Sequence, residues 1–256
     1  MTKIQGLYRY PIKGLGPEPL NRIALTPGQT IPGDRLYAIE NGPSGFDPAA
    51  PAYLSKTHFL MLMKNERLAR LRSSFDQDSH MLIIRGGKCE VRGNLRTATG
   101  RAGIERFFAD YCAGELRGAP KILHVDGHSF SDVARKVVSI INLSSVAAIE
   151  SMIGAPVHPL RFRGNVYVEG LSAWSELELV GKELKVGRPS SDRTVRLKVV
   201  KRTVRCAATN VDPDTGARDL EVPKTLLRQL GHADCGIYAE VVEGGEIAPG
   251  DQIEIL

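Results

Sequence analysis

The sequence has few cysteines and no long apolar run, and both absences exclude classes of protein. Its 256 residues include four cysteines, Cys89, Cys112, Cys206 and Cys235. None forms a CxxC pair or has zinc-finger spacing to a histidine, and so few make a disulfide framework improbable in a chain this long. No apolar stretch approaches the roughly 20 residues that span a bilayer. The N-terminus, MTKIQGLYRYPIKG, lacks the apolar core of a signal peptide. We therefore expect a cytoplasmic, reduced, soluble protein with no membrane contact.

Strong charge of one sign is also missing. The formal net charge is +5, from 34 Lys and Arg against 29 Asp and Glu, and the basic residues are dispersed. The densest basic cluster comprises Lys198, Lys201, Arg202 and Arg205. No aromatic residues are interleaved with it, so we expect no nucleic-acid partner. The cluster is either a solvated strand face or a pocket for an anion such as phosphate.

Several common catalytic motifs are absent. The six histidines show no HxH or HExxH pattern, which argues against a zinc site built from the protein alone. The chain has no GxSxG elbow and no Walker loop. These absences direct attention to the cysteines and to the basic residues at strand ends.

The sequence is rich in short strands. The expected strands are Lys3–Tyr10, Leu20–Leu25, Arg35–Glu40, Ala69–Phe75, Met81–Arg85, Cys89–Arg92, Val137–Asn142, Phe162–Glu169, Leu177–Leu179, Glu183–Val186, Val195–Lys201, Gly236–Val242 and Gln252–Leu256. The expected helices are Thr99–Cys112, Ser144–Ile153 and Pro223–Leu230. So many short strands with a few helices predict a mainly β fold with some α (α+β), built on a β-barrel.

Loops suggest how the chain is divided into domains. The stretches RGAPK and DGHSFSD, near residues 118–132, place a domain boundary that divides the chain into residues 1–120 and 121–256. Asn41–Pro51 (NGPSGFDPAAP) is rich in glycine and proline, and we expect a surface flap that suits a substrate-covering loop.

Cys206 lies where a β-branched run meets a turn, in VVKRTVRCAATNVDPDTG (199–216). Most free cysteines are small apolar core residues, and that interpretation stays open. Three features favour chemistry instead. Arg205 precedes Cys206, and a neighbouring positive charge makes a thiol more reactive. The turn formers that follow place the cysteine at a strand end, where functional groups are often displayed. The basic cluster also leads directly to it. Cys235, in HADCGIYAEV, is expected to be structural.

Other polar residues also occur at expected strand ends. Lys13 is in the first tight loop, Asp34 and Arg35 precede a strand, and Arg163 and Asn165 begin another. Each alone suits a surface position. Together they provide the Lys and Arg groups that bind a phosphate or carboxylate.

These stretches resemble one known family. LYRYPIKGLGPEPL and GDRLYAI are similar to the N-terminal β-barrel domain that accompanies MOSC domains. RFRGNVYVEG, RTVRCAATNVDPDTG, a P-x-TL helix and CGIYAEV follow in the order of the MOSC domain itself. That domain is named after the C-terminal part of molybdenum cofactor sulfurases, and it also forms the mitochondrial amidoxime-reducing component and its bacterial relatives. The resemblance covers nearly the whole chain and implies a β-barrel MOSC domain plus an N-terminal β-barrel-like domain.

The resemblance implies a molybdenum–molybdopterin cofactor with one cysteine thiolate on the metal. Cys206 is the matching residue, as metal ligand and catalytic residue. The implied contacts to the pterin and its phosphate are Lys13, Arg35, Arg163, Asn165 and Arg205, with Asn142 and Thr209 as further candidates. A thiolate is the soft donor that such a metal needs, and arginines offer bidentate bonds to phosphate. Pyridoxal phosphate binding, a general term for the family, belongs to the same expectation.

The chain departs from the family at two positions. Relatives often carry proline where this chain has Gly164, which affects the shape of that loop. Amidoxime-reducing relatives carry a serine where this chain has Asn142, which affects one cofactor contact.

The resemblance implies an oxidoreductase that reduces N-hydroxylated small molecules such as amidoximes. Its electrons come from a separate reductase or ferredoxin-like protein, because the chain has no iron–sulfur cysteine pattern. The alternative is a carrier that delivers the cofactor or sulfur to another enzyme, with Cys206 as ligand or persulfide carrier. A cofactor-free β-barrel interaction module is the third possibility.

Overall fold

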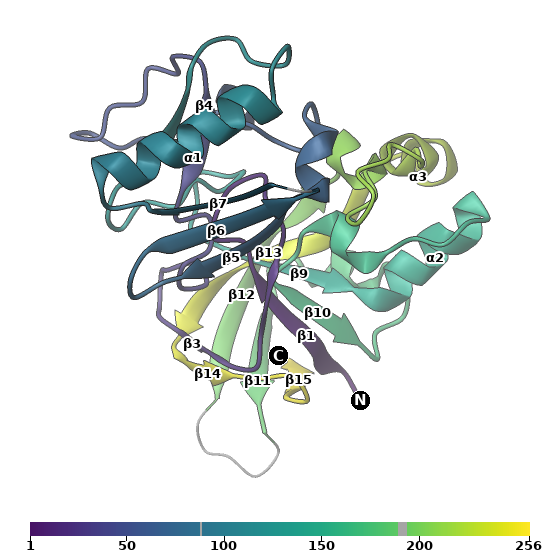
Figure 1. Cartoon of the computed structure of the whole chain (residues 1–256). Coiled ribbons are helices and arrows are strands. Elements are labelled where there is room, and N and C mark those ends of the chain that lie inside the picture. The colour runs from purple at the N-terminus through teal and green to yellow at the C-terminus, as the bar shows by residue number, and fades with distance from the viewer. Residues whose placement is uncertain (88, 189–193) are drawn as a thin grey trace.

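The computed structural model describes residues 1–87, 89–188 and 194–256 (Figure 1). In chain order the strands are β1 (Lys3–Arg9), β2 (Glu18–Leu20), β3 (Ile23–Leu25), β4 (Ala38–Asn41), β5 (Arg72–Asp76), β6 (Met81–Gly86), β7 (Cys89–Asn94), β8 (Pro120–Leu123), β9 (Val138–Asn142), β10 (Val166–Glu169), β11 (Glu183–Gly187), β12 (Val195–Val204), β13 (Asp234–Glu243), β14 (Gly245–Ile247) and β15 (Gln252–Ile255). The α-helices are α1 (Ala98–Tyr111), α2 (Leu143–Ile153) and α3 (Val222–Leu230). Short 3₁₀ helices are η1 (Lys56–His58), η2 (Glu66–Arg70), η3 (Pro159–Phe162), η4 (Ser175–Leu179) and η5 (Ala207–Asn210).

A closed barrel forms the larger part of the fold. Its strand order is β10, β9, β13, β12, β11, β15 and β1, and β1 pairs back to β10. The pair β9–β10 is parallel, and the other pairs of the ring are antiparallel. Apolar and polar residues alternate along β12, so one face of this strand packs into the barrel core. Val195, Leu197 and Val199 are on that face, with 1% exposure or less. The fold is therefore mainly β with some α, as expected.

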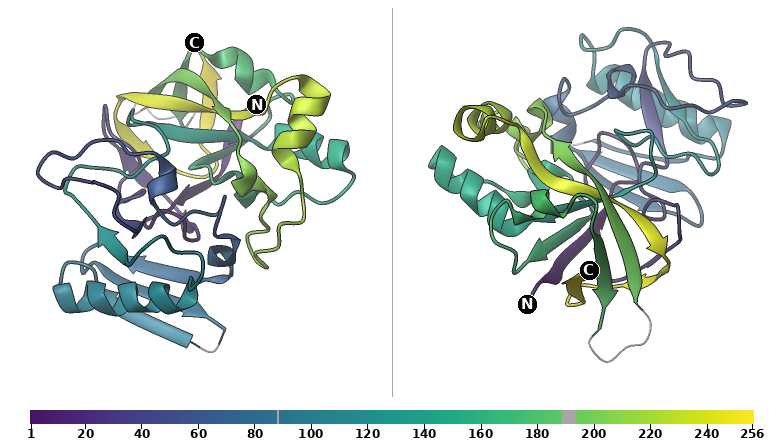
Figure 2. Two further views of the ribbon diagram at one scale, coloured as in Figure 1. Left: turned by 90° about the horizontal axis from the view of Figure 1, so that it is seen from above. Right: turned by 180° about the vertical axis from the view of Figure 1, so that it is seen from behind.

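The barrel is completed by the first strand of the chain. β1 lies between β10 and β15, so the two ends of the sequence meet in one sheet. Figures 1 and 2 show the two termini close together at the barrel. Ile4 and Leu7 of β1 are buried in the barrel core. The closed sheet therefore needs strands from both ends of the sequence.

A second core lies in the N-terminal part, between β1 and β9 in the chain. The three-stranded antiparallel sheet β5–β6–β7 lies beside α1, and β4 pairs with β8 (Figure 1). Helix α1 packs Ile104 and Phe108 of its apolar stripe into this core. The expected helical periodicity of Thr99–Cys112 is confirmed.

A third cluster joins α2 and α3 to the barrel, on the side away from α1 (Figure 2). Both helices end at a glycine in the left-handed conformation, Gly154 and Gly231, as their sequences predict. Among the described residues, no helix has the length and apolar character needed to cross a membrane.

One expected strand is wrong. Leu177–Leu179 forms the end of the 3₁₀ helix η4 instead of a strand. Leu177 and Leu179 are buried, as the apolar pattern suggests. Glu176, which directly precedes them, is fully buried as well. Its carboxylate accepts hydrogen bonds from Asn142 Nδ2 (2.9 Å), Ser145 Oγ (2.8 Å) and the Gly236 amide (3.2 Å). A buried carboxylate with several donors fixes a local turn that the apolar alternation does not reveal.

Other boundaries differ from the expected ones by a few residues. The stretch Leu20–Leu25 is two short strands, β2 and β3, and Arg35–Glu40 is strand only from residue 38 onward. The start of Ala69–Phe75 belongs to η2, and the start of Phe162–Glu169 belongs to η3 and a turn. The short strands β8 and β14 were not expected from the sequence.

Candidate functional site

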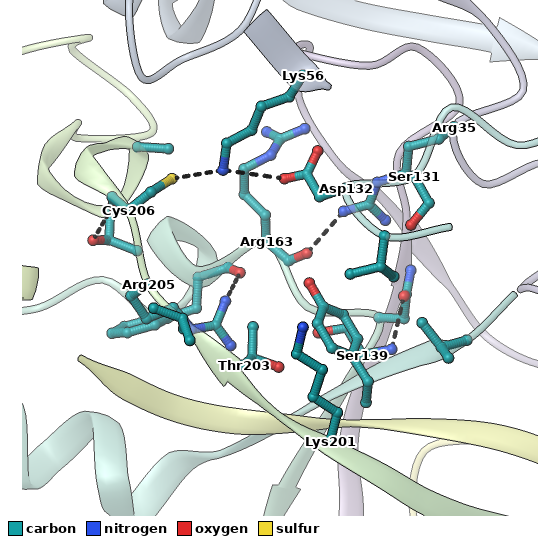
Figure 3. Close-up of a pocket in the computed structure, with 18 of the residues that line it drawn as sticks. Arg35, Lys56, Ser131, Asp132, Ser139, Arg163, Lys201, Thr203, Arg205 and Cys206 are labelled. Carbon is teal, nitrogen blue, oxygen red and sulfur yellow. Dashed lines mark hydrogen bonds and ion pairs between the residues drawn. The ribbon is translucent and has the colours of Figure 1, made fainter. Parts of the chain in front are cut away.

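A cavity of about 210 Å³ lies at one end of the barrel, where residues of the N-terminal part cover it (Figure 3). We call it the main cavity. Its lining comprises Asp34, Arg35, Lys56, Ser131, Asp132, Val133, Val137, Ser139, Arg161, Phe162, Arg163, Asn165, Lys201, Thr203, Val204, Arg205, Cys206, Ala208, Thr209 and Tyr238. Six of these residues are Lys or Arg and two are Asp, so positive charges outnumber negative ones in the lining, a composition that favours an anion.

Cys206 lies at the wall of the main cavity, directly after β12. The residue is partly exposed and precedes η5, with an extended backbone. Thr209 fixes the turn, because its backbone N–H (3.0 Å) and its hydroxyl (2.9 Å) both donate to the Cys206 carbonyl. The Cys206 thiol is therefore held at a defined position with one face open to the cavity.

The nearest charged group to the thiol is Lys56, from η1 of the N-terminal part. Its Nζ is 3.3 Å from Cys206 Sγ and 3.8 Å from Asp132 Oδ2. Burial alone would lower the pKa of the Lys56 ammonium, but the negative charges of Asp132 and Cys206 raise it above its ordinary value. Lys56 is thus a fixed positive charge beside the sulfur (Figure 3).

Asp132 links Lys56 to Lys13. The Lys13 ammonium pairs with Asp132 Oδ1 and also donates to the Phe130 carbonyl at 2.8 Å. Burial would raise the pKa of the Asp132 carboxyl, yet the charges of Lys13 and Lys56 hold it well below its usual range. Burial lowers the pKa of Lys13, although Asp132 opposes the effect. Lys13 itself lines a smaller adjoining cavity of about 50 Å³, which also contains Cys206.

The loop after Cys206 is anchored by a buried arginine. Arg161 forms a bidentate pair with Asp219 (2.8 and 2.9 Å), a bond to Asp212 (3.0 Å) and a bond to the Asn210 carbonyl (3.1 Å). Asp212 in turn accepts the amides at positions 214 and 215 and the Thr215 hydroxyl, which closes the DPDTG turn. Both terminal nitrogens of Arg161 are bonded in this network, which joins η3 to the loop, whereas its buried Nε has no partner in the described residues.

Arg35 and Arg163 approach the main cavity from opposite parts of the chain. Their guanidinium carbons lie 4.5 and 4.3 Å from the ring centre of Tyr10, one cation–π contact each. Arg35 pairs with Asp34 and donates to the Arg163 carbonyl at 3.0 Å. The Arg163 guanidinium has no ion pair or hydrogen bond within residues 1–87, 89–188 and 194–256, and burial lowers its pKa. Arg163 is therefore a partly buried cation with free donors.

Arg205 is held by two carbonyls. Its Nε donates to the Cys235 carbonyl (2.6 Å) and its Nη1 to the Phe162 carbonyl (2.8 Å). Its Nη2 is buried and has no partner in the described part of the chain, and the same is true of Thr203 Oγ1 nearby on β12. Buried donors without partners are rare in native proteins, so a hydrogen-bonding ligand is expected at this position.

The surroundings of Gly164 explain why glycine stands at this position. A Cβ atom there would lie 2.3 Å from Ile141 Cγ1, which leaves no space for a side chain. The Gly164 amide also donates to the Tyr167 hydroxyl at 3.1 Å, a bond that proline could not make. The loop between Arg163 and Asn165 is therefore matched to this chain's own neighbours.

The structure brings most of the predicted site residues together. Arg35, Arg163, Asn165, Arg205, Cys206 and Thr209 line the main cavity, and Lys13 lines the adjoining one. The Asn165 side chain is used inside the protein: it accepts the Ser139 amide and donates to the Tyr8 carbonyl, both at 3.1 Å. Asn165 therefore shapes the cavity wall.

Asn142 is not brought to the main cavity. Its side chain caps α2 by accepting the Ser144 amide (3.1 Å), and it donates to the Ser172 carbonyl (2.8 Å) and to Glu176. The expected flap at Asn41–Pro51 also contributes no residue to the lining. Instead, the segment that follows it reaches the cavity through Lys56. Within the basic cluster, Lys201 and Arg205 line the cavity, whereas Lys198 and Arg202 do not.

Several lining residues were missed by sequence reasoning. They are Lys56, Asp132, Ser139, Thr203 and Tyr238. Lys56 lies in the short 3₁₀ helix η1 and Asp132 in a loop, and the only signal in YLSKTH and HSFSDV is a charge among turn-forming residues. Ser139 and Thr203 lie in apolar strands. The only sequence signal of a site there was one hydroxyl residue among apolar neighbours.

The other cysteines differ from Cys206 in their surroundings. Cys235 is fully buried, and burial raises the pKa of its thiol to about 12. Cys112 is buried as well, with a thiol pKa raised to about 11 by the same effect, and Cys89 is exposed. Such buried thiols stay protonated and inert, as expected for structural cysteines.

The main cavity offers one thiol and no further set of metal-ligating side chains. Among the described residues, no group of three or more His, Cys, Asp or Glu is placed to hold a metal ion. A metal at Cys206 must therefore bring its other ligands with it. The unpaired donors of Arg163, Arg205 and Thr203 suit an anionic, hydrogen-bonding group attached to such a metal.

Comparison with known proteins agrees with this arrangement. The family model of the MOSC domain matches residues 123–254, and that of the MOSC N-terminal beta barrel domain matches residues 1–113. The mitochondrial amidoxime reducing component 2 of Bos taurus is 30% identical over 128 residues, which are 45% of this chain. The match spans only 36% of the length of that relative.

Two solved structures are similar at low sequence identity. The YuaD protein from Bacillus subtilis is 15% identical and has a TM-score of 0.44, with coverage of 100% of this chain and 96% of that chain. YiiM from Geobacillus stearothermophilus is 18% identical and has a TM-score of 0.35, with coverage of 46% of this chain and 53% of that chain.

Proposed function

The chain belongs to the MOSC family, and from that premise we propose that it binds a molybdenum–molybdopterin cofactor and reduces N-hydroxylated small molecules. The observation that carries the proposal is the Cys206 thiol in a cationic cavity with orphaned donors. The partial similarity to an amidoxime reducing component supports the substrate class.

The side chains of the main cavity fit such a group. Cys206 would be the thiolate ligand, because a soft sulfur donor completes a metal whose other ligands come from the pterin. Arg205 and Thr203 would bind the phosphate and pterin through buried donors that have no partner in the described residues, and the Arg163 guanidinium, which lines the same cavity, would add further donors. Arg35 and Lys13 would add positive charge, whereas Asn165 and Thr209 would shape the wall.

When bound, the cofactor supplies the two-electron chemistry, in which an N-hydroxyl compound, two electrons and two protons give the N–H compound and water. Lys56 Nζ, 3.3 Å from Cys206 Sγ, would stabilise the thiolate of the bound state and would hold a proton at the same end of the cavity. Asp132 keeps Lys56 in place and charged. In this proposal the electrons come from a separate protein.

A second function, delivery of the cofactor or of sulfur, is favoured by a different observation. The Cys206 thiol is partly exposed beside an ammonium, and such thiols carry persulfides readily. Under this function the same residues bind the cofactor, but a recipient enzyme performs the turnover.

Purified protein from a cofactor-competent host separates the two functions. With a reduced viologen as electron source, the proposed reductase converts benzamidoxime to benzamidine over many cycles. A carrier shows no turnover and instead restores the activity of a cofactor-free molybdenum enzyme when the two are mixed. Absence of molybdenum and pterin from the protein would contradict both functions.

A further inference from the structure

A groove of about 360 Å³ continues outward from the main cavity, and we call it the side groove. The two spaces share Asp132, Val133, Val137, Lys201 and Tyr238, so they lie side by side along one wall. The side groove therefore offers an approach to the main cavity for a small molecule.

Most of the side groove is apolar. Val133, Val137 and Val200 provide aliphatic surface, and the aromatic ring of Tyr53 borders it. The Tyr53 hydroxyl donates to the Asp132 carbonyl at 3.1 Å, which fixes this ring although the residue is 47% exposed. A flat apolar body such as one aromatic ring suits these walls.

The charges of the side groove are paired except for one. Arg135 pairs with Glu240 at 2.6 Å, and Asp132 pairs with Lys13 and Lys56. Lys201 has no ion pair and no hydrogen bond in residues 1–87, 89–188 and 194–256, and it lies where the groove meets the main cavity. An unpaired ammonium at this junction attracts an anion.

Lys201 and Cys206 mark two ends of the site. Figure 3 shows Lys56, Asp132 and Cys206 at one end, and Ser139, Thr203 and Lys201 at the other. Lys201 is on β12 and Cys206 follows the end of that strand; the three steps from Lys201 to Val204 alone cover about 10 Å at the rise of a strand. A molecule whose reacting group is next to Cys206 therefore has its far end near Lys201.

We propose that the substrates are N-hydroxylated compounds that carry an anionic group, such as a carboxylate, at the end opposite the N–O bond. Lys201 pairs with that anion, and the apolar wall of the side groove holds the body between the two ends. This inference rests on the proposed function, and it assigns Lys201 to substrate selection and not to the cofactor.

Three substrates of nearly one shape test the proposal: benzamidoxime, 4-carboxybenzamidoxime and the neutral methyl ester of the latter. The measured quantity is kcat/KM with a reduced viologen as electron source. The holo-protein should favour the carboxylate over its methyl ester by about fivefold, the size expected of one partly exposed ion pair. The preference should shrink as salt screens the pair. In Lys201→Gln, the ratio of the two kcat/KM values should fall to about one.

Lys198→Gln is the matched control, because Lys198 is on the same strand but outside both spaces, and it should keep the wild-type ratio. Molybdenum content is measured on all three proteins. Turnover without any preference for the carboxylate would overturn the inference and leave the proposed function intact. Loss of molybdenum in Lys201→Gln would also overturn it, since Lys201 would then hold the cofactor. No turnover on any substrate would overturn the inference together with the proposed function.

Discussion

Two arginines of the main cavity have backbone conformations that few side chains adopt. Arg35 and Arg163 have φ angles of 49° and 52°, in the left-handed region. Such a conformation is unfavourable for residues with a Cβ, and it persists where the surroundings impose it, often at functional sites. Here it directs both guanidinium groups over Tyr10 and toward the cavity. The Arg163 group then has free donors for an anion.

Replacement of Arg163 by alanine should weaken cofactor retention. A charge-assisted hydrogen bond to a buried phosphate contributes about 1.5–3 kcal/mol, so the cofactor should dissociate roughly 10- to 100-fold more readily. The measurement is pterin and molybdenum content after extended dialysis. Arg202→Ala is the control, because Arg202 donates to the Leu177 carbonyl and does not line the cavity. Full retention in Arg163→Ala would show that Arg163 does not bind the cofactor.

Single residues were predictable where a motif carried them. Cys206, Arg205 and Arg163 stand in short stretches whose residue types suggest an anion site, and the structure places all three at the main cavity; the metal at Cys206 is implied by the resemblance and stays a prediction. Lys56 and Asp132 could not be placed, because the contacts of Lys56 with Cys206 and with Asp132 join segments about 75–150 positions apart through folding alone. Asn142 shows the opposite case, since a polar residue at a strand end serves here as a helix cap.

At the scale of elements, the loop from Cys206 to Asp219 depends on one buried arginine. Arg161 is supplied by η3, and its guanidinium joins Asp212 and Asp219. η3 also leads into the turn that carries Arg163 and Gly164. Two loops of the site are therefore positioned by one short element, and their geometry is coupled.

Replacement of Arg161 by methionine should loosen the Cys206 loop. Removal of one partner from a buried ion pair is destabilising, and because Asp212 and Asp219 are partly exposed we expect a loss of about 2 kcal/mol. Denaturant unfolding measures this loss, and hydrogen exchange of residues 206–219 should increase before global unfolding. Unchanged exchange in this loop would show that Arg161 does not anchor it.

Alanine at Gly164 should be destabilising because of its neighbour. The new Cβ would overlap the Ile141 side chain, and such overpacking costs about 1–3 kcal/mol. In an Ile141→Ala background the same change should cost much less, because the overlapping atoms are gone. The double-mutant cycle measures this coupling by denaturant unfolding. If Gly164→Ala lowered the free energy of unfolding equally with Ile141 present and in the Ile141→Ala background, the overlap with Ile141 would not be the cause.

Elements with a strong local signal could be predicted from the sequence. The periodicity of α1 and the glycine ends of α2 and α3 are local features, and the structure confirms them. η4 could not be distinguished from a strand, because its buried Glu176 takes its donors from α2, β9 and β13. Only the tertiary structure supplies these partners.

At the scale of the whole molecule, the barrel is closed by a strand from the other end of the chain. β1 pairs with both β10 and β15, and its residues Ile4 and Leu7 fill the barrel core. No local sequence pattern reveals the order of strands in a barrel. The sequence therefore predicted a barrel but not which strands pair to close it. The division into residues 1–120 and 121–256 stays a prediction.

A fragment of residues 121–256 should fail to fold stably. It lacks β1, and the loss of two fully buried aliphatic side chains removes about 3–6 kcal/mol from a total stability of about 5–15 kcal/mol. It also leaves the edges of β10 and β15 unpaired. Circular dichroism and thermal unfolding test this. Residues 1–12 appended after Leu256 through a short glycine-rich linker should restore folding. A stable fragment without β1 would contradict the role of this strand.

The central claim is that Cys206 ligates the metal of a molybdenum–pterin cofactor. Molybdenum content per chain, measured on wild type, Cys206→Ser and Cys235→Ala from a cofactor-competent host, tests it most directly. Wild type should hold about one molybdenum per chain, as a site with one thiolate ligand implies. Cys206→Ser should fold normally but lose most of the metal, since a serine hydroxyl is a poor soft donor. Cys235→Ala should keep the metal, because Cys235 is a buried core residue. Normal molybdenum in Cys206→Ser, or its loss in Cys235→Ala alone, would contradict the account.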